Sequence, residues 1–170
     1  MNARPATGDA GPYYFTYINH VEGTDCLAAM TAQREPALAF FRGISEAKST
    51  HRYAPDKWSI RQVLNHVNDT ERLFTFRALW FARTLPDPLP SFEQEIAAAG
   101  AEADRLSWAA LVDEFDHVRR ASIDFFRNLD DPAWTRRGIA SGNSFTVLSL
   151  GFMVPGHVTH HMGILRERYL

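Results

Sequence analysis

Three of the seven histidines lie in the short stretch HVTHH, residues 157–161. His157 and His161 are four residues apart, so on a helix they lie on one face, one above the other. We expect both imidazoles to point into the protein, because their stripe also carries the apolar residues Leu150, Val154, Ile164 and Leu165. His160 is about 100° away around the helix axis, and we expect it at the edge of this face or outside it.

A third histidine lies on another apolar stripe far upstream. His66 stands among Val63, Val67, Thr70, Leu73 and Phe74. One such histidine is more often a satisfied core residue than a ligand. Three inward imidazoles from two helices, however, would need separate hydrogen-bond partners in a poorly solvated place. A divalent metal ion satisfies three imidazole nitrogens at once and keeps positions open for water or substrate. The pattern therefore predicts a metal site at His66, His157 and His161, although the HxxxH spacing alone is common.

Three further residues are candidates for catalytic roles beside this site. Glu71 falls near the inner stripe that carries His66, and either Glu71 or His160 is a candidate proton shuttle. Arg77 is eleven residues after His66 and returns to nearly the same angle on the helix, so it is a candidate for holding an anionic substrate group. For Glu71 and Arg77, a salt-bridged helix residue is an equally good interpretation.

Composition limits the classes of function. A chain of 170 residues with 45% hydrophobic and 22% charged residues is typical of one folded domain. The net charge of -2 argues against nucleic acid as a partner. The single cysteine excludes an internal disulfide and a cysteine-cluster zinc site. No apolar stretch is long enough to span a bilayer, and no signal pattern begins the chain, so we expect a cytoplasmic protein without membrane contact.

Four helical segments must position the histidines. They are expected over about 25–42, 59–84, 107–129 and 146–168. Ser59 and Gln62 form the pattern of a capping box, which is the sharpest local signal in the chain. Residues 1–12 are predicted to be a flexible N-terminal arm, and residues 13–170 to be the folded domain. The aromatic stretch YYFTYINHV, residues 13–21, is predicted to be an extended lead-in that packs on the helices.

Four long helices without a convincing strand pattern predict an all-α fold, an antiparallel four-helix bundle. The connection between the second and third helices is about twenty residues long, and its SFEQEI stretch is a candidate for a short extra helix. Tyr17, Tyr53, Trp58 and Asn143 are candidates for lining a pocket. The stretch RRGIASGNSF is interpreted either as a loop over the site or, with preference, as an ordinary surface connection.

Two blocks of sequence carry a resemblance to a known family. YAPDKWSIRQVLNHVNDTERLFTFRAL, followed far downstream by GHVTHHMGILRERYL, resembles the DinB-like (DinB/YfiT) superfamily of four-helix metalloproteins. The resemblance covers the chain from about Tyr17 to Leu170. It implies a metal site at His66, His157 and His161, nickel or zinc as the ion, and a homodimer. Pro155 departs from the small or apolar residue that is usual in the family before the fourth-helix ligands.

The resemblance also implies two chemistries on a small-molecule substrate. Some relatives are similar to metal-dependent hydrolases, and others are transferases or isomerases that use a low-molecular-weight thiol such as mycothiol or bacillithiol. We expect a metal-dependent enzyme, and we prefer the thiol-dependent S-transferase reading, because a thiolate needs less help from a base. Two alternatives stay open: a non-catalytic metal-binding or stress-associated interaction protein, and a metal-free bundle.

Overall fold

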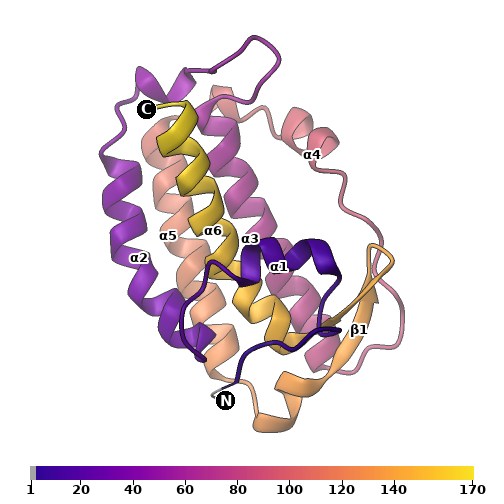
Figure 1. The fold of residues 1–170 in the computed structure, drawn as a ribbon. Helices are drawn as coiled ribbons and strands as arrows, with labels where there is room; N and C mark the ends of the chain where they lie inside the picture. The colour runs from indigo at the N-terminus through magenta and orange to yellow at the C-terminus, as the bar shows by residue number, and fades with distance from the viewer. Residues whose placement is uncertain (1–2) are drawn as a thin grey trace.

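Four long helices form the body of the protein (Figure 1). The computed structural model describes residues 3–170, and within that range these helices are α2 (Cys26–Arg42), α3 (Ile60–Ala82), α5 (Trp108–Arg127) and α6 (Val147–Arg168). The predicted all-α four-helix bundle is confirmed. None of the helices in the described range is long and apolar enough to cross a membrane.

Each long helix begins at a side chain that caps it. Asp25, Ser59, Ser107 and Thr146 each accept a hydrogen bond from the backbone N–H three residues on. The capping box predicted at Ser59 and Gln62 is complete, since each side chain bonds the other residue's backbone N–H. These caps explain why the helix starts could be predicted. α2 also continues through Pro36 without being split.

The helices are arranged so that α5 and α6 each pack against both α2 and α3. One apolar cluster joins the start of α2 to the end of α3, the end of α5 and the start of α6, and a second cluster joins their opposite ends. The pairs α3–α6 and α2–α5 are therefore antiparallel, as predicted, whereas α3 and α5 run in the same direction (Figure 1). The antiparallel contact of α3 with α6 is the one that matters for the histidines.

The parallel direction of α3 and α5 comes from the long connection over 83–107. It carries the chain back along the bundle before α5 begins, and it contains α4 (Gln94–Ala101) and the short 3-10 helix η3 (Ala103–Arg105). The short helix expected within SFEQEI is confirmed by α4. Because α4 lies against α3, this connection can supply side chains to the region around His66.

The lead-in over residues 13–21 is helical, so the predicted extended conformation is wrong. A 3-10 helix, η1 (Pro12–Tyr14), runs into α1 (Phe15–Ile18), which packs against α6. Pro12 pre-sets the first helical turn, and burial of Tyr17 and Ile18 stabilises it. The approach is so close that a Cβ on Gly156 would overlap the Tyr17 backbone carbonyl.

A β-hairpin precedes α6, so the expectation of no strands is also wrong. Strands β1 (Arg137–Ala140) and β2 (Asn143–Thr146) are antiparallel. The two turn residues, Ser141 and Gly142, have φ of 49° and 71°, as a type I′ turn requires. The Ser-Gly pair between short apolar stretches was the signal that could have predicted this hairpin. Two further 3-10 helices are η2 (Lys48–Thr50) and η4 (Asp131–Thr135).

The described part of the predicted N-terminal arm touches the body of the protein. Arg4 donates hydrogen bonds to the carbonyl oxygens of Ile18, Val21 and Gly23, and the Asp9 carbonyl accepts from the N–H of Thr146. The division into a flexible arm at residues 1–12 and a domain at 13–170 stays a prediction, and residues 1 and 2 lie outside the described range.

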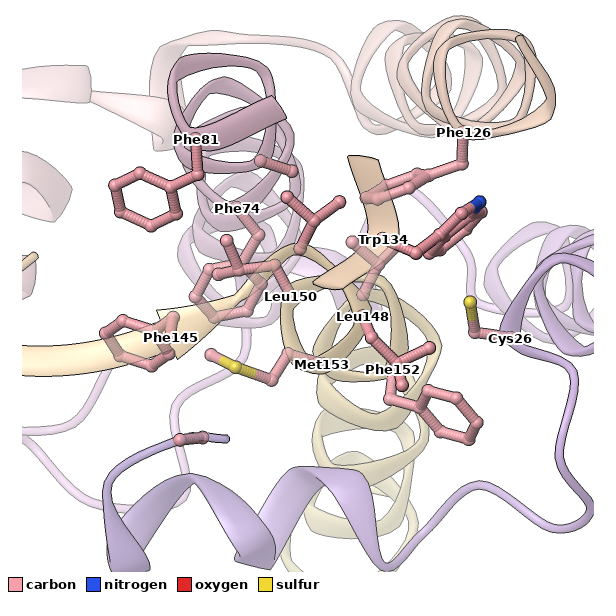
Figure 2. Packing of buried hydrophobic residues seen from close by; sticks show 14 of the residues in the cluster. Cys26, Phe74, Phe81, Phe126, Trp134, Phe145, Leu148, Leu150, Phe152 and Met153 are labelled. Carbon is pink, nitrogen blue, oxygen red and sulfur yellow. The ribbon is translucent and has the colours of Figure 1, made fainter. Parts of the chain in front are cut away.

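The core has two apolar parts with buried polar groups between them. Figure 2 shows the part near the hairpin, where Phe126 and Trp134 stack and Phe145, Leu150 and Met153 pack beside Phe74 and Phe81. Between the two apolar parts along the helices lies a polar layer, which we define as Gln33, Glu71 and Arg119.

Gly156 and Gly163 form a matched pair on α6 for testing the α1 contact. Gly156→Ala should lower the free energy of unfolding by about 1–3 kcal/mol, because the new Cβ meets the Tyr17 backbone, which cannot rotate away. Gly163→Ala should stabilise the protein by up to about 1 kcal/mol, because a Cβ there meets no atom within 4 Å. Urea denaturation measures both values. If the two variants changed the free energy of unfolding equally, the position of α1 would not depend on the close contact between Gly156 and the Tyr17 backbone.

Candidate metal centre

The three predicted ligand histidines lie together at the contact between α3 and α6. The Nε2 atom of His157 is 3.2 Å from Nε2 of His66 and 3.0 Å from Nε2 of His161. The available ligand atoms of all three lie within 4.8 Å of one another. Positions 91 and 95 residues apart in the sequence are thus brought together by the antiparallel packing of two helices.

The spacing fits a shared metal ion better than hydrogen bonds. A neutral imidazole Nε2 offers either one N–H or one lone pair, so Nε2 of His157 can satisfy one of its two short contacts but not both. Tetrahedral ligands at the usual zinc–nitrogen distance are about 3.3 Å apart. A metal ion accepts a lone pair from each ring and removes the conflict.

Burial keeps the three rings neutral. Desolvation lowers the pKa of His66 to about 4 and that of His161 to about 3, with smaller contributions from neighbouring histidines. The pKa of His157 is lowered well below its ordinary value for the same reason. Neutral imidazoles have the free lone pair that a metal ligand needs.

Aromatic rings enclose the cluster. Tyr17 meets His157 edge-on at 5.0 Å between ring centroids, Phe74 meets His157 at 5.8 Å, and Trp58 lies 5.0 Å from His66. The hydroxyl of Thr70 lies 3.4 Å from Nδ1 of His66 and is a candidate for orienting that ring. The Nδ1 atom of His161 has no hydrogen-bond partner within residues 3–170.

Two cavities reach the histidines from different sides. A cavity of about 380 Å³, which we call the large cavity, reaches His161 and is walled by Tyr53, Trp58 and Tyr169. A second of about 120 Å³, the small cavity, reaches His66 and His157. Small molecules therefore have two routes to the three rings.

Glu71 lies in the polar layer and not in either cavity. Both of its carboxylate oxygens accept from the guanidinium of Arg119 at 2.9 Å, and the two side chains are 2% and 0% exposed. Arg119 also donates to Gln33, whose amide donates in turn to the Pro155 carbonyl and the Thr159 hydroxyl. Both oxygens of Glu71 are thus bonded inside a network that joins all four long helices, and the carboxylate is not available as a proton shuttle.

The other predicted candidates are divided between the surface and the cavities. His160 is half-buried beside Tyr17 and His20 and lines neither cavity. Arg77 lines the small cavity.

Tyr53 and Trp58 line the large cavity, as suggested, whereas Asn143 lines neither.

Sequence reasoning missed several residues that line the small cavity. They come from the lead-in, the long connection and the hairpin turn: Tyr13, Tyr14, Phe92, Gln94 and Ser141. The stretch containing Ser141 therefore reaches the site, against the preferred interpretation as an ordinary surface connection. No periodic pattern marks these residues, because each lies in a segment positioned by tertiary contacts.

A sequence profile described as the DinB superfamily matches residues 29–165. The match includes most of each long helix and the three clustered histidines. No curated protein matches the chain significantly.

Two solved structures share the fold. YfiT from Bacillus subtilis, described as a probable metal-dependent hydrolase with an unusual four-helix bundle topology, is 13% identical with a TM-score of 0.66; the match covers 98% of this chain and 91% of that one. A mycothiol-dependent maleylpyruvate isomerase is 12% identical with a TM-score of 0.71, over 86% of this chain and 61% of the isomerase. At these identities the likeness shows a common fold.

The Glu71–Arg119 pair should be needed for stability. Arg119→Met should lower the free energy of unfolding by about 3–5 kcal/mol, because it leaves Glu71 buried without a counter-ion. The control Arg120→Met removes an exposed arginine that pairs with Asp116 on the same helix. It should cost at most about 1 kcal/mol, because Asp116 keeps Arg34 as a partner. Urea denaturation compares the two variants. Similar losses in both would argue against a structural role for the buried pair.

Proposed function

Since the chain belongs to the DinB superfamily, we propose that it is a divalent-metal-dependent enzyme whose ion is held by His66, His157 and His161. The observation that carries the proposal is the meeting of three Nε2 atoms, at the spacing of metal ligands, beside two cavities. Nickel and zinc both suit imidazole ligands and are the proposed ions. The proposed substrate is a small molecule, since the cavities are of that size.

A divalent ion in this place supplies Lewis-acid chemistry, because it lowers the pKa of a water molecule or thiol that it binds. The chain's own residues supply the surroundings. Burial keeps the imidazoles neutral, and Tyr17, Phe74 and Trp58 limit the access of bulk water. A water-poor site strengthens each electrostatic interaction made there.

We propose an external low-molecular-weight thiol as co-substrate, which makes the enzyme a thiol-dependent S-transferase. The chain's one cysteine, Cys26, is buried, and desolvation raises the pKa of its thiol to about 12. A thiol with that pKa is a poor nucleophile at neutral pH, so the thiolate has to come from outside. A structural neighbour named as mycothiol-dependent agrees with this choice.

Hydrolysis is the second candidate, and the placement of the carboxylates makes it less favoured. Activation of water is helped by a nearby general base. The described residues that line the small cavity include no Asp or Glu. The large cavity has Asp56 and Glu95, but Asp56 is bonded to Lys57, and Glu95 accepts from the Trp58 indole. The homodimer and the cytoplasmic location stay predictions from the sequence.

Metal content tests the site directly. Tag-free protein should contain nickel or zinc close to one ion per chain, and His66→Ala and His157→Ala should lose it, because each removes one of three ligands. His117→Ala, at an exposed position on α5, should retain the ion. Elemental analysis measures the content, and circular dichroism checks that each variant is folded. A parent that takes up no metal after incubation with excess nickel or zinc would sink the proposal.

Activity assays distinguish thiol transfer from hydrolysis and from a non-catalytic role. With metal-loaded protein, turnover of a model electrophile such as 1-chloro-2,4-dinitrobenzene should require an added thiol (mycothiol, bacillithiol or glutathione) and should fall at least about 100-fold in His157→Ala. Hydrolysis of p-nitrophenyl acetate without any thiol would favour the hydrolase instead. A stoichiometric metal ion with neither activity would favour the non-catalytic alternative.

A further inference from the structure

Three arginines within residues 3–170 are buried, and one of them lacks a counter-ion among these residues. Arg61 pairs with Glu46, and Arg119 pairs with Glu71. Arg77 is equally buried, with 2% of its surface exposed, yet it forms no ion pair with any carboxylate in residues 3–170. A buried charge without a partner is costly, so the exception calls for an explanation.

The hydrogen bonds of Arg77 leave part of its guanidinium unused. Its Nη2 donates to the Ser141 hydroxyl at 2.7 Å and to the Pro90 carbonyl at 3.3 Å. Its Nε is buried and has no partner among the described residues. Desolvation lowers the pKa of the guanidinium, and an interaction with the Tyr14 hydroxyl partly offsets this effect. An arginine side chain stays charged in a protein. The guanidinium of Arg77 is therefore a positive charge with an unused N–H donor, held between α3 and the turn of the β-hairpin.

The small cavity connects this charge to the histidines. Arg77 and Ser141 line the same cavity of about 120 Å³ as His66 and His157. An anion bound by Arg77 is therefore close to the proposed metal ligands.

We infer that Arg77 and Ser141 bind the carboxylate group of the substrate, and that the substrate entering the small cavity is a small organic acid or the acid end of a larger molecule. The interpretation of this anion site as a substrate site rests on the proposed function. The guanidinium is planar and suits a planar carboxylate. Ser141 accepts from Arg77 and keeps its own proton free to donate to the same anion.

In this arrangement each of the two cavities receives a different reactant. The acid lies on the side of His66 and His157, which leaves the large cavity beside His161 for the thiol. The large cavity carries Lys57 and Arg168 as well as Asp56 and Glu95 among its walls, so it suits a larger polar molecule. An electrophilic acid and a thiol can then approach the three rings from different sides.

Isothermal titration calorimetry of the full-length protein tests the inference. The probes are acetate, propionate and pyruvate, with acetamide as the neutral counterpart of acetate and inorganic phosphate as a competing anion, all at one ionic strength. The acids should bind the parent and acetamide should not. Arg77→Met should weaken acid binding roughly 10- to 100-fold, because one charged hydrogen-bonding group is lost.

Three further variants serve as controls for fold and geometry. Arg83→Met, at the exposed end of α3, should leave the affinity for the acids unchanged. Arg77→Lys keeps the charge without the planar fork and should bind with intermediate affinity. Ser141→Ala should weaken binding less than Arg77→Met. Arg77→Met should stay folded by circular dichroism, because it removes a buried charge and leaves no carboxylate unpaired.

Running the titration before and after dialysis against a chelator separates this inference from the proposed function. Acid binding that depends on Arg77 and persists after the chelator would support the anion site whatever the metal content. Failure of the protein to take up nickel or zinc again would sink the metal-dependent enzyme and leave the anion site standing. A metal-loaded protein that binds none of the acids would overturn the anion site alone. Equal binding of acetate by the parent and Arg77→Met, or tight phosphate binding with no acid binding, would also overturn it.

Discussion

The bundle depends on the buried ion pair of Glu71 and Arg119. The two side chains face each other across α3 and α5, and Gln33 extends the pair to α2 and to the Pro155 carbonyl of α6. An ion pair in an apolar interior tolerates little change in geometry, because its charges are stable there only while every donor and acceptor is matched. The polar layer therefore fixes the four helices at the level where His157 projects from α6.

At the proposed metal centre, buried polar groups lack the partners that the polar layer has. In the polar layer each buried charge has its counterpart within the protein, so the layer is complete. Three Nε2 atoms of buried or half-buried histidines make contacts that hydrogen bonds cannot all satisfy, and the buried guanidinium of Arg77 lacks an anion. Incomplete buried polar groups beside a cavity indicate where external groups bind.

The fold is shared with the two solved neighbours, whereas part of the wall of the small cavity comes from segments outside the long helices. Tyr13 and Tyr14 belong to the lead-in, Phe92 and Gln94 to the connection before α5, and Ser141 to the hairpin turn. Connecting segments vary more freely than a packed core, because their length and side chains are not constrained by helix packing. Relatives with the same bundle can therefore bind different substrates, and 12–13% identity to the two solved neighbours leaves room for that.

The sequence alone determined the local features of this protein. The starts of the four long helices follow from caps within three residues, and the inward positions of His66, His157 and His161 follow from helical periodicity. Only the tertiary structure decided that Glu71 has a partner while Arg77 has none, and that the lead-in is helical. These features depend on groups 48 or more residues apart or on packing against another helix, and helical periodicity gives the angle of a side chain but not its neighbour.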